Sequence, residues 1–192
     1  MKIGVLALQG DFALHAAMLA AAGADPVEVR SGSDLLPLDG VVIPGGESTT
    51  MSMLLRSAGL VEPISGALSD GMPALGTCAG MILLAKEVTD GRADQISFAA
   101  IDISVRRNAF GRQAESFEAD IDIGDGEPLR AVFIRAPGVE ATGSEVEVLG
   151  RLAFGPRANE AVLCRQGAVM ACSFHPEVSG DARIHELFLQ HC

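Results

Sequence analysis

Gly76-Thr77-Cys78-Ala79-Gly80 lies between two apolar stretches, residues 72–75 and residues 81–86. The first stretch is typical of a buried strand and the second of a helix. Small residues around Cys78 allow the sharp, strained turn that presents a nucleophile at the end of a strand, and a following helix N-terminus favours its thiolate. We therefore predict a strand–turn–helix unit with Cys78 as nucleophile. The backbone amide of Ala79 is its natural oxyanion donor. The alternative is a buried cysteine in a glycine-rich connection.

A second segment, Cys172-Ser173-Phe174-His175-Pro176-Glu177, lies far along the chain. A thiolate nucleophile needs an imidazole to exchange protons, and the imidazole needs a carboxylate to fix its tautomer. Side chains two residues apart point the same way in an extended segment, and a proline favours that conformation in the residue before it. We therefore predict that His175 and Glu177 stand side by side as the partners of Cys78. Taken alone, His175 would be a surface histidine before a turn.

Composition limits the class of protein. The chain has 192 residues, of which 48% are hydrophobic and 20% charged, so we expect a single compact domain spanning residues 1–192. A net charge of −11 argues against nucleic acid and anionic membranes as partners. No apolar stretch reaches the ~20 residues of a membrane span, and residues 1–8 are too short for a signal peptide. Four cysteines, one with a chemical use, favour a reduced cytoplasmic protein.

Two hydrophobic patterns divide the chain. In the first half, apolar runs at residues 3–8, 26–30 and 40–43 alternate with helical patterns at residues 11–22 and up to residue 55, which favours βαβ units. From residue 101 the pattern becomes strict alternation, which is typical of half-exposed antiparallel strands. A final helix is expected over residues 182–190. The predicted fold is α/β, with a mostly parallel central sheet flanked by helices and additional antiparallel strands.

The loop Pro44-Gly45-Gly46-Glu47-Ser48 follows a predicted buried strand, so its amides are expected at the carboxyl edge of the sheet. Glycines allow close approach to a substrate, which makes the amide near Gly46 a second candidate oxyanion donor. Ser48 or Thr49 is the expected N-cap of the next helix. The loop lacks the lysine and glycine spacing of a phosphate-binding P-loop. Gln9 ends the first strand and is expected at the same crevice.

Two arginines are candidates for binding a substrate carboxylate. Arg107 belongs to the single basic cluster of an acidic sequence, and Arg135 stands at a predicted strand end. A solvated loop is the alternative explanation for the cluster. His15, His185 and His191 lie on predicted helices without metal-like spacing, so we interpret them as structural and predict no metal site.

These segments together resemble the triad (class I) glutamine amidotransferases, and within that family the glutaminase subunits of pyridoxal 5'-phosphate synthase. The elbow and the His-Pro-Glu segment are typical of the whole family. The vitamin B6 branch is indicated by two further segments, Arg107-Asn108-Ala109-Phe110-Gly111-Arg112-Gln113 and Phe133-Ile134-Arg135-Ala136-Pro137. The resemblance covers essentially the whole chain.

The resemblance implies hydrolysis of L-glutamine to L-glutamate and ammonia through a glutamyl thioester, with no cofactor. It implies that Cys78 is the nucleophile, with His175 and Glu177 as its relay. It implies glutamine contacts at the following positions: Gly46, Glu47, Ser48, Arg107, Ile134 and Arg135. Ammonia would pass to a barrel-fold synthase subunit in a hetero-oligomeric complex. The helix start at residues 11–14 and a lengthened loop at residues 155–159 depart from the family pattern.

Two other functions remain open from the sequence. The chain could be a different thiol hydrolase on the same fold, such as a peptidase or a γ-glutamyl hydrolase. It could also be a non-catalytic regulatory subunit, although an intact Cys-His-Glu set argues against a decayed site.

Overall fold

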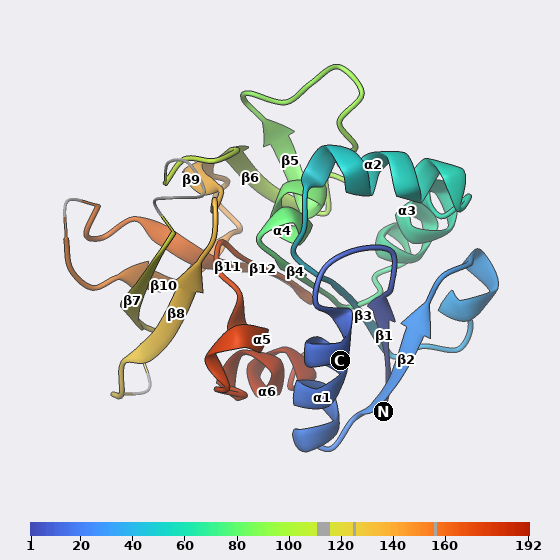
Figure 1. Cartoon of the computed structure of the whole chain (residues 1–192), viewed down its shortest axis with the longest axis horizontal. Coiled ribbons are helices and arrows are strands. Elements are labelled where there is room, and N and C mark those ends of the chain that lie inside the picture. The colour runs from blue at the N-terminus through green and yellow to red at the C-terminus, as the bar shows by residue number, and fades with distance from the viewer. Residues whose placement is uncertain (111–115, 125, 156) are drawn as a thin grey trace.

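A long mixed sheet organises the computed structural model of the chain, which describes residues 1–110, 116–124, 126–155 and 157–192. Within these residues the sheet has nine strands in the order β2-β1-β3-β4-β12-β11-β10-β7-β8. A second sheet of three strands has the order β5-β6-β9. Helices cover the faces of the long sheet, and strands far apart in sequence lie beside one another in it (Figure 1).

The strands of the long sheet, in chain order, are β1 (Lys2–Leu6), β2 (Asp25–Val29), β3 (Gly40–Ile43), β4 (Ala74–Thr77), β7 (Phe117–Asp122), β8 (Leu129–Phe133), β10 (Glu147–Leu152), β11 (Ala161–Gln166) and β12 (Val169–Cys172). The small sheet comprises β5 (Ala85–Val88), β6 (Ile101–Arg106) and β9 (Gly138–Thr142). The helices are α1 (Phe12–Ala21), the 3-10 turn η1 (Gly32–Leu35), α2 (Ser48–Ser57), α3 (Val61–Ser69), α4 (Ala79–Leu84), α5 (Pro176–Ser179) and α6 (Arg183–Leu189).

The long sheet is parallel in one half and antiparallel in the other. β2, β1, β3, β4 and β12 pair in parallel, and β11, β10, β7 and β8 continue the sheet through antiparallel pairs. β3 and β4 are buried at every residue, as expected for parallel strands covered on both faces. The predicted α/β class, with a parallel central sheet and added antiparallel strands, is confirmed.

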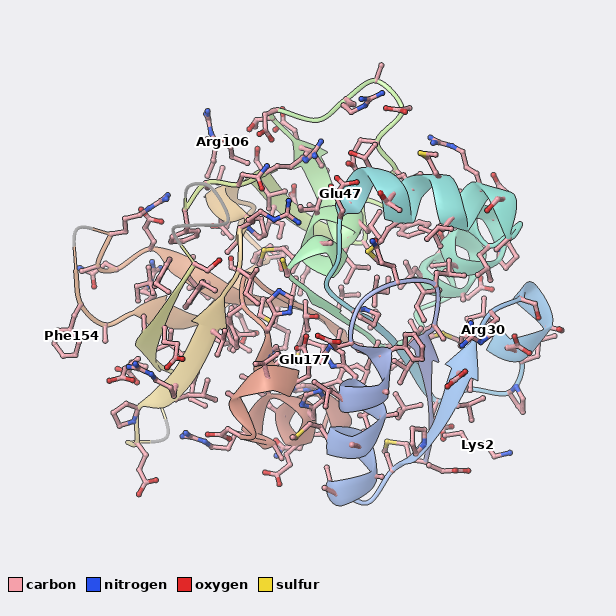
Figure 2. The ribbon with its side chains drawn as sticks, in the orientation of Figure 1. Lys2, Arg30, Glu47, Arg106, Phe154 and Glu177 are labelled. Carbon is pink, nitrogen blue, oxygen red and sulfur yellow. The ribbon has the colours of Figure 1, made fainter. Side chains whose placement is uncertain are left out.

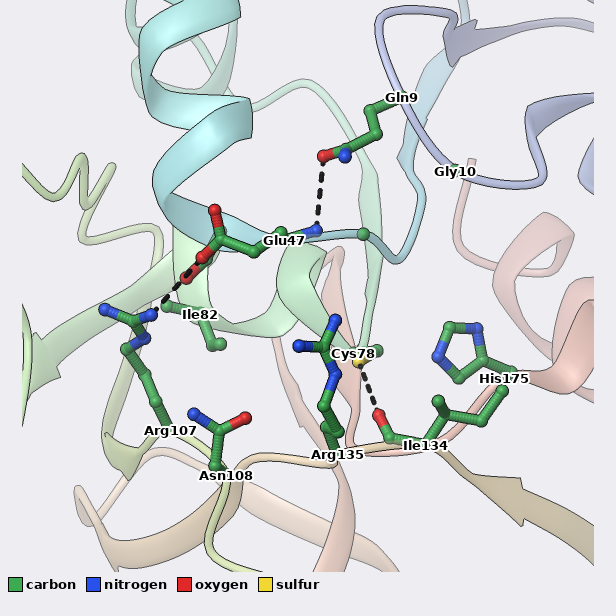
Figure 3. A pocket seen from close by; sticks show the side chains of 12 residues that line it. Gln9, Gly10, Glu47, Cys78, Ile82, Arg107, Asn108, Ile134, Arg135 and His175 are labelled. Carbon is green, nitrogen blue, oxygen red and sulfur yellow. Dashed lines mark hydrogen bonds and ion pairs between the residues drawn. The ribbon is translucent and has the colours of Figure 1, made fainter. Parts of the chain in front are cut away.

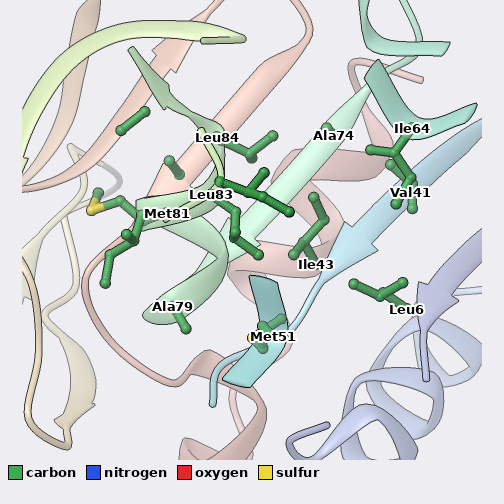
Figure 4. Packing of buried hydrophobic residues seen from close by; sticks show 14 of the residues in the cluster. Leu6, Val41, Ile43, Met51, Ile64, Ala74, Ala79, Met81, Leu83 and Leu84 are labelled. Atoms are coloured by element: carbon green, nitrogen blue, oxygen red, sulfur yellow. The ribbon is translucent and has the colours of Figure 1, made fainter. Parts of the chain in front are cut away.

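Alternating side chains divide the core into two clusters on opposite faces of the sheet. In β3, Val41 and Ile43 belong to one cluster and Val42 to the other. Met51 from α2 and Ile64 from α3 pack on the first face (Figure 4). The second face is covered by α1 and α6, which contribute Leu19 and Phe188 among others. Both faces are therefore closed, and substrate access is left to the sheet edge.

Some predicted boundaries are wrong. The helix predicted over residues 81–86 ends at Leu84, and the chain continues directly as β5. β6 was expected to be antiparallel, but it pairs in parallel with β5 and antiparallel with β9. The short elements η1 and α5, and also α3 and β9, have no counterpart in the prediction. No helix among the described residues combines the length and the apolar character needed to span a membrane.

Candidate active site

The carboxyl ends of four parallel strands meet at one edge of the sheet. Gln9, Gly46, Cys78 and His175 follow β1, β3, β4 and β12 respectively, and all four line a single cavity. Ligands of open parallel sheets bind outside this edge, because the loops there come from several strands at once. The predicted crevice is therefore present, and it holds the predicted nucleophile and its histidine.

Cys78 stands at a strained turn between β4 and α4. Its backbone angles are φ 49° and ψ −104°, in a region that non-glycine residues rarely adopt. The turn requires glycines on both sides, because a Cβ at Gly80 would overlap the carbonyl of Ile43 and one at Gly76 would lie 2.6 Å from the backbone of Gly80. The geometry has the form of a nucleophile elbow. Ala79 is the first residue of α4, where backbone N–H groups have no partner within the helix.

His175 and Glu177 come from the junction of β12 and α5. The predicted extended segment is wrong, because a helix begins at Pro176, a position that suits proline at the first helical residue. The side chains are nevertheless adjacent, with His175 Nδ1 2.7 Å from Glu177 Oε1. The His175 backbone N–H donates to the carbonyl of Val132 at 2.9 Å, which ties the junction to β8.

Cys78 approaches His175 closely enough to raise the pKa of the imidazole. The Cys78 thiol lies 3.7 Å from the carbonyl oxygen of Ile134, the next contact across the cavity. Burial acts to lower the pKa of His175, but the interactions of its ring with Cys78 and Glu177 outweigh it and raise that pKa to about 10. The imidazole is therefore held in its charged form between a sulfur and a carboxylate.

Gly45 and Gly46 belong to the loop after β3, where Gly45 packs against His175 and Gly46 lines the cavity. A Cβ at Gly45 would overlap the imidazole of His175, so the loop can pass the histidine at this distance only with glycine there. Gly46 has φ 155°, and a Cβ there would lie 2.9 Å from Oε1 of Gln9. The same Gln9 oxygen accepts from the backbone N–H of Glu47 at 3.2 Å (Figure 3).

Glu47, rather than Ser48 or Thr49, is the N-cap of α2, which corrects the prediction. Its carboxylate accepts from the backbone N–H groups of Thr49 and Thr50 at 3.0 and 2.7 Å, and from the Thr50 hydroxyl at 2.8 Å. Burial acts to raise the pKa of Glu47, but these donors lower it to about 2. Ser48 follows as the first helical residue and lines the cavity.

The cavity has a volume of about 350 Å³. Arg107 and Arg135 line it together with Ile134, and Arg107 Nη2 lies 3.3 Å from Glu47 Oε1. Figure 3 shows both guanidinium groups on the wall that faces the Glu47 loop. All residues predicted to contact glutamine therefore line one cavity. Ala79, the predicted oxyanion donor, does not line it but directly follows Cys78. The segment quoted for the resemblance continues through Gly111, Arg112 and Gln113, which lie outside the described residues, as does Pro156 of the lengthened loop.

Sequence reasoning missed His15. Its Nε2 lies 3.2 Å from Glu177 Oε2, and its Nδ1 lies 2.9 Å from Nε2 of His185. Burial lowers the pKa of both histidines, that of His185 to about 3. The available signal was that His15 and Leu19 stand four residues apart on a helix, which places His15 on the buried face. Among the described residues, no three His, Cys, Asp or Glu side chains form a group suited to a metal ion.

Glu177 is buried between the imidazoles of His15 and His175. Burial acts to raise its pKa, but the hydrogen bond from His175 and the charges of His15 and His175 lower it. The carboxylate is therefore ionised and bound to His175. Figure 2 shows Glu177 in the interior of the molecule, while Phe154 and Arg106 lie at its periphery.

A family model described as the SNO glutamine amidotransferase family matches residues 5–192. A pyridoxal 5'-phosphate synthase subunit PdxT from Acidothermus cellulolyticus is 57% identical over 190 residues, which cover 98% of this chain and 92% of that protein. Its counterpart from Rhodococcus jostii is 56% identical over 191 residues, covering 97% and 95%.

A crystal structure described as a glutamine amidotransferase is similar over 98% of this chain and 97% of its own, with 44% sequence identity and a TM-score of 0.88. The match of the family model extends over the elbow, the Glu47 loop and the His175–Glu177 junction. The chain therefore belongs to the SNO glutamine amidotransferase family.

Proposed function

We propose that this chain is the glutaminase subunit of a pyridoxal 5'-phosphate synthase, and that it hydrolyses L-glutamine to L-glutamate and ammonia. The observation that carries the proposal is that Cys78, at its strained turn, and His175 line one cavity at the sheet edge, while the buried Glu177 is bound to His175 behind it. We call these three residues the triad. Family membership and the relatives named PdxT support the same activity.

The first half of the reaction is acyl transfer to sulfur. The Cys78 thiolate attacks the side-chain carboxamide carbon of glutamine and forms a C–S bond. The amides near Gly46 and of Ala79 donate to the oxyanion that develops on the carbonyl oxygen. The charged His175 gives its proton to the amide nitrogen, the C–N bond breaks, and ammonia leaves. The product is a γ-glutamyl thioester on Cys78.

The second half hydrolyses that thioester. His175, now neutral, takes a proton from water, and the hydroxide attacks the thioester carbon. The C–S bond then breaks and glutamate leaves. The proton taken from water remains on His175, so the thiolate–imidazolium pair is restored. Glu177 holds Nδ1 of His175 at 2.7 Å throughout, which fixes the tautomer and stabilises the charged ring.

Binding of free glutamine is supported by the size and charges of the cavity. Its volume lies at the lower end of ligand pockets, which span about 300–1,000 Å³, and this suits one amino acid. Arg107 and Arg135 supply cations for the α-carboxylate of the substrate. Gly46, Glu47, Ser48 and Ile134 complete the binding wall with backbone and side-chain groups.

The second part of the proposal concerns the fate of ammonia. The chain forms a hetero-oligomeric complex with a barrel-fold synthase subunit, which takes up the ammonia to build pyridoxal 5'-phosphate. The relatives named as subunits of that synthase support this assembly. The cytoplasm is the proposed compartment, because the cysteines in the described residues are free.

Replacing the nucleophile tests the activity. Cys78→Ala should abolish ammonia release from glutamine, by a factor of at least about 10⁴, because removing a nucleophile removes the covalent path. Ammonia should be measured with the synthase subunit present, beside the unaltered chain and a Cys192→Ser control, whose thiol is exposed and distant. Glutamine should still bind Cys78→Ala by calorimetry. Unchanged turnover in Cys78→Ala would end the proposal.

A further inference from the structure

The triad continues beyond Glu177 into a buried chain of imidazoles. Glu177 has two carboxylate oxygens, of which Oε1 is bonded to His175 and Oε2 lies 3.2 Å from His15 Nε2. The side chains of His15 and Glu177 are both 0% exposed, so water does not reach their contact. A buried carboxylate oxygen without a donor destabilises the folded state, so the contact with His15 stabilises this end of Glu177.

The proton positions follow from this contact. A carboxylate oxygen only accepts, so His15 must carry its proton on Nε2 to be attracted to Glu177. The same nitrogen lies 3.3 Å from Thr77 Oγ1, so its N–H is shared between two oxygens and points straight at neither. This sharing explains why Glu177 Oε2 lacks a well-aligned hydrogen bond.

His185 fixes that tautomer from the other side. With its proton on Nε2, His15 has a lone pair on Nδ1, which lies 2.9 Å from His185 Nε2. His185 must then carry its own proton on Nε2, and its Nδ1 becomes the buried lone pair without a partner among the described residues. The opposite arrangement would point the His15 lone pair at a carboxylate and leave an unpaired N–H at His185. The first arrangement is the favourable one.

We propose that His15 is a positioning residue of the reaction, which holds the buried oxygen of Glu177 and thereby fixes the plane in which Glu177 presents its other oxygen to His175. The proposal rests on the proposed function. Through Thr77, which precedes Cys78, His15 also touches the strand that carries the nucleophile. α1, α5, α6 and β4 are thus linked at one imidazole behind the triad.

Two variants that carry the same functional group separate an effect on the position of Glu177 from an effect on packing. His15→Gln carries its amide N–H at about the reach of the lost Nε2 and can still donate to Glu177. His15→Asn carries its amide near the place of Nδ1, so it can meet His185 but not Glu177. Both are neutral, polar and buried, so their packing and desolvation effects are similar. Their thermal melting, followed by circular dichroism, checks that both are folded.

The first measurement needs neither glutamine nor a partner. Alkylation of Cys78 by iodoacetamide, measured against pH in a Cys192→Ser background, reports the interaction of the sulfur with His175. Asp11, His175 and Glu177 are the titratable groups whose charges act on His15, and His185 lies against it at 2.9 Å. In His15→Asn the pH of half-maximal alkylation should rise by about one unit, because Glu177 no longer supports the charged imidazole. In His15→Gln it should stay within a few tenths.

The second measurement is ammonia release with the synthase subunit present. His15→Asn should lower kcat by about 10²-fold with KM unchanged, since a displacement near 1 Å has this effect on a reacting group. His15→Gln should recover most of kcat. Equal alkylation profiles and equal kcat in the two variants would overturn the role of His15. If the unaltered chain releases no ammonia while the alkylation profiles differ, the proposed function fails and the positioning role stands.

Discussion

The triad and the wall that faces it are built in different ways. The triad residues are 2% to 9% exposed and stand where β4 and β12 end, neighbouring strands that pair in parallel with Thr77 opposite Cys172. The facing wall carries Arg107, Asn108 and Arg135, which follow β6 and β8. Asn108 and Arg135 have positive φ, and both sit outside regular structure. The triad therefore belongs to the core, while Arg107, Asn108 and Arg135 belong to loops.

The sheet edge therefore separates the triad from the residues of the facing wall that are proposed to bind substrate. Packed strands fix a position to within fractions of an ångström, because the interior is dense and side chains have few alternatives. Loops can change length and composition without disturbing that core. Substitutions beside the triad should therefore change kcat, and substitutions in the facing wall should change KM.

The largest effect among the substitutions that spare the triad is expected at Gly45. Gly45→Ala places a methyl group within the imidazole of His175, so the ring must move away from Cys78. We expect kcat for glutamine to fall by about 10²-fold with little change in KM. Gly66→Ala is the matched control, because a Cβ there meets nothing within 4 Å and alanine favours its helix. Full activity in Gly45→Ala would contradict the close packing of loop and histidine.

An intermediate effect is expected at Arg107. Arg107→Gln removes a cation from the cavity, and hydrogen bonds to charged groups contribute about 1.5–3 kcal/mol, so KM for glutamine should rise by about 10–100-fold. kcat should stay within about threefold. Arg106→Gln is the neighbouring control, since Arg106 pairs with Glu140 at an exposed site. A fall in kcat at constant KM would show that the wall takes part in the chemistry.

The smallest effect is expected from His185, and it concerns stability. Burial lowers its pKa to about 3 in the folded chain, against an ordinary 6.5. Between pH 6.5 and pH 3 His185 is therefore protonated in the unfolded chain but not in the folded chain. The free energy of unfolding falls as the pH drops through this range. His185→Gln keeps a donor towards His15 but does not titrate.

Urea denaturation of His185→Gln at pH 7 and pH 4 measures this contribution. The free energy of unfolding should differ less between the two pH values in the variant than in the unaltered chain. His191→Gln serves as control, because His191 is much less buried. An equal loss of stability in both His185→Gln and the unaltered chain would show that His185 is already charged in the folded state.

Local patterns in the sequence identified the parts of the site that depend on few residues. Glycines around Cys78 predicted the turn, and Gly45-Gly46 predicted a loop close to a substrate, because both features need small residues at fixed places. Apolar runs predicted the parallel strands of the core. The α/β class and the crevice followed from these strands.

Features that depend on distant packing were not predictable in the same way. His15 reads as one more buried helix residue, and only the fold brings it to Glu177 from α1. The adjacency of His175 and Glu177 was expected from an extended strand but arises from a helix start at Pro176. Ser48 and Thr49 carry the side chains usual at an N-cap, but the longer side chain of Glu47 reaches two backbone N–H groups and caps the helix instead.

The parallel pairing of β4 with β12 has a practical consequence. Cys78 and His175 belong to segments that meet only when these two strands align, so neither half of the chain can react alone. A break in the exposed stretch Asp90–Arg92 would leave the thiol on one fragment and the imidazole on the other. Glutaminase activity would then return only when the two fragments pair β4 with β12. Such fragments, fused to two other proteins, could report whether those proteins come together.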